Sequence, residues 1–282
     1  MAEFLSPPDL SKTLLGVGEK KAALPVPKMF ILGILAGVYI GFAAHLATTI
    51  STGPFEWFGV QKFLTGAVFA CGLMLVIIPG SELWTGNNLM TVALCQKRIT
   101  FGAMLRNWVF VYAGNLVGSV FLAVIIAKFS GLLSGPVGGT AIKIASAKTA
   151  SANIGDLSHN FAFFFRGIGC NWLVCLAVMM AVSAQDIAGK VWGIFFPIMA
   201  FVASGFEHCI ANMYFIPAGI FAKDFTAAVE ASKLDPSALD AINWGTMWSY
   251  NLISVTLGNL VGGAIFTGMV YWWIFVRGTK EA

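Results

Sequence analysis

The polar side chain best suited to chemistry in this sequence stands inside a long apolar stretch. His208 follows Glu207 near the middle of residues 191–222, most of which are apolar. An ionisable side chain in such a place is costly to bury and is usually kept for a function. Histidine can donate, accept or exchange a proton near neutral pH, so it suits an acid or its anion as a partner. The alternative is a packed histidine whose ring only satisfies a neighbouring group.

An eight-residue pattern around His208 occurs twice in the chain. Residues 80–87 and residues 205–212 both follow Gly-x-Glu-x4-Asn, and both interrupt apolar stretches too long for one membrane span. Such an interruption indicates a broken helix, whose freed backbone groups must be covered by protein or by a water-lined cavity. The following half-helix then directs partial positive charge at the centre, which favours an anion. We expect the glutamates, Glu82 and Glu207, to cap freed N–H groups rather than to carry protons.

The elements that hold these patterns are membrane-spanning helices. Of 282 residues, 58% are hydrophobic and 11% are charged, about half the charged share of a soluble domain. A span needs about 20 apolar residues, and the sequence offers six apolar units of that kind. The units are Met29 to Ser51, Phe63 to about Cys95, Val109 to Ala127, Phe161 to Ala184, Val191 to about Ala222, and Met247 to Val276.

A second recurring pattern shows how the two halves are related. Two asparagines eight residues apart occur at Asn107 and Asn115, and again at Asn251 and Asn259, the second of each pair within Gly-Asn-Leu-Val-Gly. The paired glycines would let helices approach closely. Because each copy holds three spans, the second copy must enter the membrane from the opposite side. The predicted fold is an all-α integral membrane protein with six transmembrane helices in a 3+3 inverted repeat, the second and fifth broken.

The predicted boundaries and orientation follow from charge. Residues 1–28 form a cytoplasmic segment with a short amphipathic helix starting near Ser6, residues 29–276 form the transmembrane domain, and residues 277–282 form a tail. With both termini in the cytoplasm, ten lysines and arginines lie inside and seven outside, as expected for the inner, or plasma, membrane. The polar connections are predicted at residues 96–106, 131–160, 185–190 and 223–243.

Composition excludes several classes of function. The net charge is +4, and no basic run interleaved with aromatic residues indicates nucleic acid. The five cysteines lie in apolar stretches and are expected to be free thiols, so we predict no metal and no cofactor. The three histidines lie in different segments, which disfavours a haem-bearing membrane enzyme. No glycine-rich loop with a lysine indicates nucleotide-driven pumping.

Four motifs resemble the formate/nitrite transporter family. They are residues 201–213, residues 80–87, residues 170–177 and the pair Gly258–Asn259, and the resemblance covers nearly the whole chain. It implies an aquaporin-like protomer, a homopentamer with one pore in each protomer, and no enzymatic activity. It also implies transport of a small monovalent anion such as formate or nitrite, with hydrosulfide as an alternative. A channel for neutral solutes is a more distant alternative, because no Asn-Pro-Ala motif is present.

The resemblance also implies roles for individual residues. His208 would hydrogen-bond or protonate the anion at the centre of the pore, and the sequence leaves both mechanisms, and passive or proton-coupled flux, open. For the apolar residues in the list below, the alternative role is core packing. For the polar residues in that list, the alternative role is hydrogen bonding between helices. Trp84 stands where the family usually has phenylalanine and would narrow the pore or shift its selectivity. The implied residues are Thr85, Asn171 and Asn259 as further donors, Phe69, Leu73, Leu83, Trp84 and Phe201 as constrictions, and Lys148 at the entrance.

Overall fold

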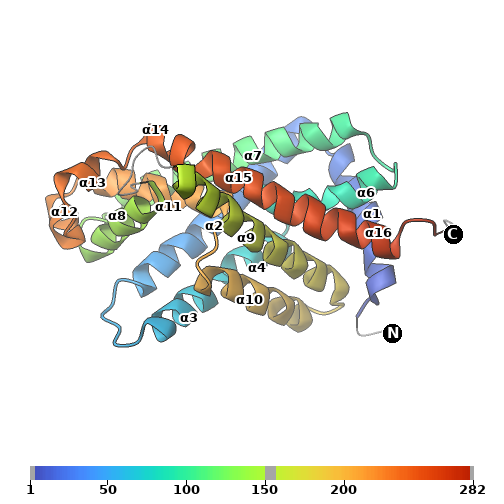
Figure 1. Cartoon of the computed structure of the whole chain (residues 1–282), viewed down its shortest axis with the longest axis horizontal. Helices are drawn as coiled ribbons and strands as arrows, with labels where there is room; N and C mark the ends of the chain where they lie inside the picture. Colours follow the sequence, from blue (N-terminus) through green and yellow to red (C-terminus); the bar gives the residue numbers. More distant parts are fainter. Residues whose placement is uncertain (1–3, 150–156, 280–282) are drawn as a thin grey trace.

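The computed structural model describes residues 4–149 and 157–279, and these residues are almost entirely helical (Figure 1). Their extended structure is limited to an isolated bridge between Phe4 and Ala184. Five helical segments are long and apolar enough to cross a membrane, and two shorter apolar helices adjoin one another. The five are Val26–Ile50, Phe58–Ile77, Phe101–Phe129, Ser158–Ser183 and Trp244–Phe275, and the shorter two are Ile187–Ala203 and Cys209–Ala222.

The first half of the chain runs from α1 to α7. Ser6 caps α1, its hydroxyl accepting a hydrogen bond from the Asp9 N–H at 3.4 Å. The helix therefore begins at the predicted start signal. The helices are α1 (Pro7–Ala23), α2 (Val26–Ile50), α3 (Phe58–Phe69), α4 (Cys71–Ile77), α5 (Trp84–Asn87), a 3-10 turn (Asn88–Met90), α6 (Thr91–Cys95) and α7 (Phe101–Val124), which continues as a π-helical turn (Ile125–Phe129).

The second half runs from α8 to α16. Its last span contains two π-helical segments between its α-helical parts. The helices are α8 (Pro136–Thr149), α9 (Leu157–Ser183), α10 (Ile187–Ala203), α11 (Cys209–Ala222), α12 (Thr226–Ser232), α13 (Pro236–Asp240), α14 (Trp244–Met247), a π segment (Trp248–Leu252), α15 (Ile253–Leu260), a second π segment (Val261–Met269) and α16 (Val270–Phe275).

Helix breaks occur at both predicted places. α4 ends at Ile77 and α5 begins at Trp84, while α10 ends at Ala203 and α11 begins at Cys209. Gly80 and Gly205 have φ of +93° and +78°, a backbone conformation that glycine adopts without steric cost. The two Gly-x-Glu motifs therefore supply the turns that interrupt the spans.

Glycines at helix crossings bring the neighbouring spans close together. A side chain at Gly118 of α7 would collide with the Ile34 carbonyl of α2, and one at Gly258 of α15 would collide with the Phe164 carbonyl of α9. The absence of a side chain lets the backbones touch, as the glycine pairs predicted. These two crossings hold the unbroken spans of each half together.

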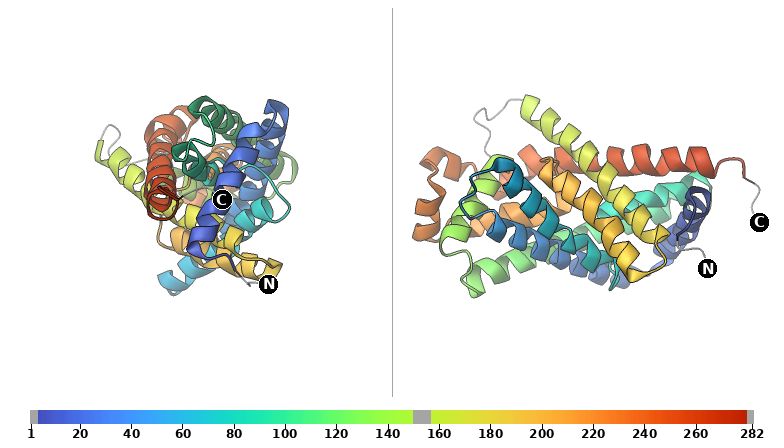
Figure 2. Two further views of the ribbon diagram at one scale, coloured as in Figure 1. Left: turned by 90° about the vertical axis from the view of Figure 1, so that its right-hand side faces the viewer. Right: turned by 90° about the horizontal axis from the view of Figure 1, so that it is seen from below.

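The prediction for residues 131–160 was incomplete, because α8 forms within this expected polar connection. Gly138 and Gly139 of α8 pack against Ala228 and Ala231 of α12, and Ala141 and Ala145 of α8 pack against Gly219 of α11, so tertiary contacts hold this helix in place. α1 and α8 lie at opposite ends of the long axis, α1 beside α16 and α8 beside α12 (Figures 1 and 2). Residues 280–282 of the predicted tail lie outside the described residues.

Candidate functional site

Three cavities lie one after another through the helical core. A cavity of about 240 Å³ borders α1 and is called the α1 cavity, and one of about 490 Å³ borders α8 and is called the α8 cavity. Between them lies a central chamber of about 10 Å³. The chamber is lined by Ile40, Phe69, Leu73, Leu83, Val174, Ile198, Phe201 and His208.

Shared lining residues order the cavities. Leu73 and Leu83 line both the α1 cavity and the chamber. Phe69, Phe201 and His208 line both the α8 cavity and the chamber. The path from one large cavity to the other therefore crosses a leucine pair, the chamber and a phenylalanine pair. The rings of Phe69 and Phe201 pack edge to face with centroids 5.8 Å apart.

His208 occupies the second helix break and is the N-cap of α11. Its Nδ1 accepts a hydrogen bond from the Ala211 N–H at 3.1 Å. Its Nε2 lies 2.9 Å from the hydroxyl of Thr85, which belongs to α5 after the first break. The side chain is buried, and its ring centroid is 5.9 Å from that of Phe201. The two breaks thus meet at one buried pair of polar side chains.

Asn115 and Asn259 satisfy the backbone of the two breaks. Asn115 accepts the Trp84 N–H at 3.0 Å and donates to the carbonyl oxygens of Gly33 and Glu82. Asn259 accepts the Cys209 N–H at 2.9 Å and donates to the carbonyls of Gly167 and Glu207. Each amide therefore bonds one N–H and one C=O of its break, groups that lack helical partners, and its third bond reaches a carbonyl of a neighbouring helix, α2 or α9.

These contacts correct the predicted role of the two glutamates. The freed N–H groups are bound by the asparagines and, at Ala211, by His208, whereas the Glu82 and Glu207 carboxylates bind lysine and asparagine side chains. A carboxylate accepts hydrogen bonds but donates none, whereas an amide can do both. The amide alone can satisfy an N–H and a C=O of one break together.

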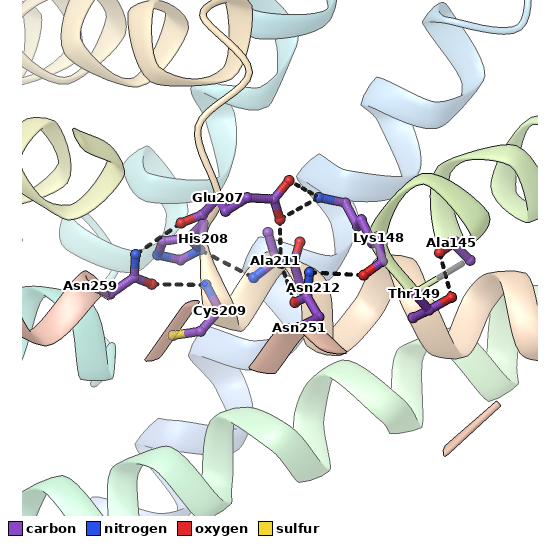
Figure 3. Close-up of polar contacts among 10 residues, drawn as sticks. All are labelled: Ala145, Lys148, Thr149, Glu207, His208, Cys209, Ala211, Asn212, Asn251 and Asn259. Atoms are coloured by element: carbon purple, nitrogen blue, oxygen red, sulfur yellow. Dashed lines mark hydrogen bonds and ion pairs between the residues drawn. The ribbon is translucent and has the colours of Figure 1, made fainter. Parts of the chain in front are cut away.

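A closed polar ring connects α8, α11 and the last span (Figure 3). The Lys148 ammonium lies 2.9 and 2.8 Å from the two Glu207 carboxylate oxygens. Asn212 donates to Glu207 at 2.6 Å and to the Asn251 side chain at 2.7 Å. Asn251 in turn donates to the Lys148 carbonyl at 3.3 Å, which closes the ring. Lys148 also lines the α8 cavity.

The same ring recurs around the α1 cavity. Lys21 lies 2.6 Å from Glu82, Asn87 donates to Glu82 at 2.7 Å and to Asn107 at 2.8 Å, and Asn107 donates to the Lys21 carbonyl at 3.2 Å. The sequence analysis missed Lys21, the counterpart of Lys148. A signal for Lys21 was present in the sequence. Glu82, Asn87 and Asn107 repeat Glu207, Asn212 and Asn251, so a lysine equivalent to Lys148 could have been sought ahead of the first span.

Asn171 and Trp84 lie beside the chamber but do not line it. Asn171 is buried, and its amide donates to the Asn88 side chain at 2.9 Å and to the Asn259 carbonyl at 2.8 Å. The buried Trp84 ring packs edge to face on Trp108 and Tyr112. Neither residue, nor Asn259, borders the three cavities. For both asparagines the observed contacts are the hydrogen bonds between helices that the alternative interpretation expected.

The described residues contain no group of three or more histidine, cysteine, aspartate or glutamate side chains that could hold a metal ion. The side chains described above supply hydrogen bonds, charge and an apolar lining. These features can be compared with known proteins.

A family model described as formate/nitrite transporter matches residues 9–273. The chain belongs to the formate/nitrite transporter family. This membership makes it a membrane transport protein of an anion-channel family, in agreement with the resemblance carried by the four motifs. Its relatives in the family are transporters and channels, not enzymes.

Relatives of the formate/nitrite transporter family match over almost their full length. A probable formate transporter of Methanothermobacter thermautotrophicus is 41% identical, over 98% of this chain and 99% of the relative. The formate channel FocA of Escherichia coli (strain K12) is 37% identical, over 98% and 96%. A solved pentameric formate channel with formate bound superposes with a TM-score of 0.79 at 38% identity, over 89% of this chain and 98% of that one.

Proposed function

We propose that this chain is a membrane channel for small monovalent anions of weak acids, with formate or nitrite as its substrate. The observation that carries the proposal is the central chamber, in which His208 is the single polar residue among eight lining residues. A dry apolar chamber repels a bare ion because the ion loses its hydration there. One hydrogen-bonding side chain in the chamber gives a small weak acid or its anion a partner.

The proposed path runs from the α1 cavity to the α8 cavity. Leu73 and Leu83 form the first constriction, and Phe69 and Phe201 form the second. These apolar side chains exclude hydrated cations and larger solutes, while a small anion is held for a short time at His208. Thr85 acts with His208 as its hydrogen-bond partner. Trp84, Asn171 and Asn259 support the helix breaks from behind the chamber.

The electrostatics of the α8 cavity favour anions. Lys62, Lys148 and Arg166 line this cavity together with one carboxylate, Glu207. Three positive side chains and one negative side chain leave an excess of positive charge, which raises the local concentration of an anion. Lys148 therefore serves as an entrance residue.

The proposed assembly is a homopentamer in the inner, or plasma, membrane with both termini in the cytoplasm. The pentamer rests on the solved pentameric formate channel that this chain resembles. An aquaporin-like 3+3 inverted repeat is supported by the matched helix breaks and by the two equivalent polar rings. In this arrangement α1 covers the cytoplasmic mouth of the path and α8 covers the outer mouth.

Flux into proteoliposomes tests the proposal. Labelled formate, nitrite and hydrosulfide are compared across a pH series for the wild type, for His208→Ala and for the control His159→Gln, whose ring lies at the start of α9 against Phe163. We expect uptake of formate or nitrite, a large decrease in His208→Ala, and wild-type uptake in the control. Uptake of hydrosulfide without formate or nitrite would replace the proposed substrate by hydrosulfide. Passage of water or glycerol without any anion would replace the proposal by a neutral-solute channel.

A further inference from the structure

The α8 cavity contains two cations besides the lysine of the polar ring. That lysine, Lys148, is engaged by the Glu207 carboxylate of the same cavity at 2.8 Å (Figure 3). Lys62 of α3 and Arg166 of α9 also line the cavity. Within the residues that the structure describes, neither of them forms an ion pair. Their positive charges therefore remain available to an anion that enters the cavity.

Both of these side chains lie against aromatic rings. The Lys62 Nζ lies 5.3 Å from the centroid of the Phe58 ring, and the Arg166 Cζ lies 5.3 Å from that of the Phe163 ring. A ring face attracts a cation but does not neutralise it as a carboxylate does. An ammonium group has three N–H donors, and a guanidinium group has five in a planar fork that matches the oxygens of an oxyanion. The pair therefore offers an oxyanion both charge and hydrogen bonds.

The opposite end of the path is electrically different. Among the described residues, Lys21 is the one charged side chain that lines the α1 cavity. It lies 2.6 Å from Glu82, so its charge is matched by a carboxylate. The excess of positive charge along the path therefore belongs to the α8 cavity alone.

The α8 cavity is large enough for an ion that the chamber rejects. The cavity has a volume of about 490 Å³, whereas the chamber beyond Phe69 and Phe201 has about 10 Å³, room for no more than about one water molecule. The cost of removing hydration rises with the square of the ionic charge, so an apolar chamber excludes a dianion far more strongly than a monoanion. The attraction of a fixed cation for the anion also doubles with the charge of the anion. A dianion is therefore held more strongly in the cavity and stopped more firmly at its inner end.

We propose that the α8 cavity is a binding site for a divalent oxyanion, such as sulfate or hydrogen phosphate, held at Lys62 and Arg166. A dianion bound there occupies the route that leads to Phe69 and Phe201, so it inhibits the passage of a small monovalent anion. The inhibition rests on the proposed channel function, whereas the binding rests on the cavity alone. The site makes the channel sensitive to divalent anions on one side of the membrane.

Calorimetry of the full chain in lipid nanodiscs tests the binding. Sodium sulfate is the titrant, and sodium chloride keeps the ionic strength constant. We expect the affinity to fall about tenfold or more in Lys62→Gln/Arg166→Gln, because hydrogen bonds from charged groups are lost. The control Lys143→Gln, which removes an exposed lysine of α8 outside the cavity, should bind sulfate as the wild type does.

Two results of this titration would overturn the inference. One is the absence of sulfate binding by the wild type, and the other is equal binding by the wild type and the double variant. Lys62 is half-buried and Arg166 is exposed, so their replacement by glutamine is compatible with folding. An unchanged melting temperature without sulfate verifies the fold of each variant.

Formate uptake tests the inhibition and its sidedness. Right-side-out and inside-out membrane vesicles are compared, with sulfate or with chloride of equal ionic strength added outside. We expect sulfate to reduce uptake several-fold in the one orientation that exposes the α8 cavity. In the double variant, sulfate should change uptake little relative to the uptake of that variant without sulfate.

The outcomes of the uptake experiment are separable from those of calorimetry. Equal uptake with sulfate and with chloride, equal inhibition in both orientations, or entry of labelled sulfate into the vesicles would overturn the proposed inhibition. If the wild type carried no formate, the proposed function would fail, and calorimetry would still decide whether the α8 cavity binds a dianion.

Discussion

Tyr112 and Thr256 hydrogen-bond to one another through their hydroxyl groups, at 2.9 Å. Each stands five residues after the first asparagine of its pair, Asn107 or Asn251, so the two residues hold equivalent positions in the two halves. Equivalent residues can touch only where an axis relating the halves passes between them. The contact therefore supports the proposed inverted repeat, whose axis would pass between α7 and α15, near Trp84 and Cys209.

Replacing Asn259 by leucine is expected to destabilise the protein. The substitution removes the side-chain partner of the Cys209 N–H and of the Glu207 carbonyl in a buried place, at a cost of about 1–3 kcal/mol for each unsatisfied group. Thermal unfolding in detergent measures the effect, with a substitution at the exposed Gln185, Gln185→Leu, as control. An unchanged melting temperature in Asn259→Leu would mean that the hydrogen bonds of the amide do not stabilise this helix break.

We expect substitutions of Lys148 and Glu207 to have non-additive effects on the free energy of unfolding. Both side chains are mostly buried, with exposures of 14% and 8%, so removing one leaves the other charge without a partner. Lys148→Met alone should cost about 3–5 kcal/mol, whereas Lys148→Met/Glu207→Gln should cost less than that single change. A double-mutant cycle of denaturant unfolding measures both. Additive costs would show that the ring does not couple these residues.

Gly118 and Gly102 form a matched pair on α7. A methyl group at Gly118 would collide with the Ile34 backbone, whereas one at Gly102 would meet no atom within 4 Å. Gly118→Ala should therefore separate α2 from α7 and lower the melting temperature by several degrees or prevent folding. Gly102→Ala should keep or slightly raise it, because alanine favours a helix by about 1 kcal/mol over glycine. Equal melting temperatures for the two variants would refute the predicted close contact.

Leu83 and Leu89 separate the effect of the chamber from that of the α1 cavity. Leu83 lines both spaces, whereas Leu89 lines only the α1 cavity. Leu83→Ala should widen the constriction, so that acetate, which carries one more methyl group than formate, gains entry. The measurement is the ratio of acetate to formate uptake, which should rise several-fold in Leu83→Ala and stay unchanged in Leu89→Ala. A rise in both variants would place the constriction elsewhere.

We expect the helix α13, which lies outside the spans and has Asp235 as its N-cap, to be sensitive to acid. Its carboxylate accepts hydrogen bonds from the Ser237 hydroxyl at 2.7 Å and from the Ala238 N–H at 2.8 Å, which lower the pKa of Asp235. A lowered folded pKa contributes stability above the unfolded pKa, about 3.9, that is lost as the pH falls through the folded pKa. Amide-exchange protection at Ala238 should therefore fall in acid, and should be pH-independent in Asp235→Asn.

Much of the fold could be predicted from local sequence. Apolar length gave the spans, and the glycine of each Gly-x-Glu motif gave the place of each break, because such features act within a few residues of the chain. The helix in residues 131–160 escaped prediction, since α8 is stabilised by packing against α11 and α12, which follow it by many residues. The spacing of the asparagines indicated two related halves before any contact was known.

The candidate site, like the fold, could be predicted from the sequence only in part. The sequence by itself determined that His208 stands in a helix break and that its surroundings are apolar. The tertiary structure decided which partners the two ring nitrogens of His208 meet, that Lys21 matches Lys148, and that Trp84 packs on Tyr112 and does not line the chamber. The reason is distance along the chain, since His208 meets a partner 123 residues away and Lys21 one 61 residues away. Local spacing carries no record of such contacts, which exist only once the two halves have packed together.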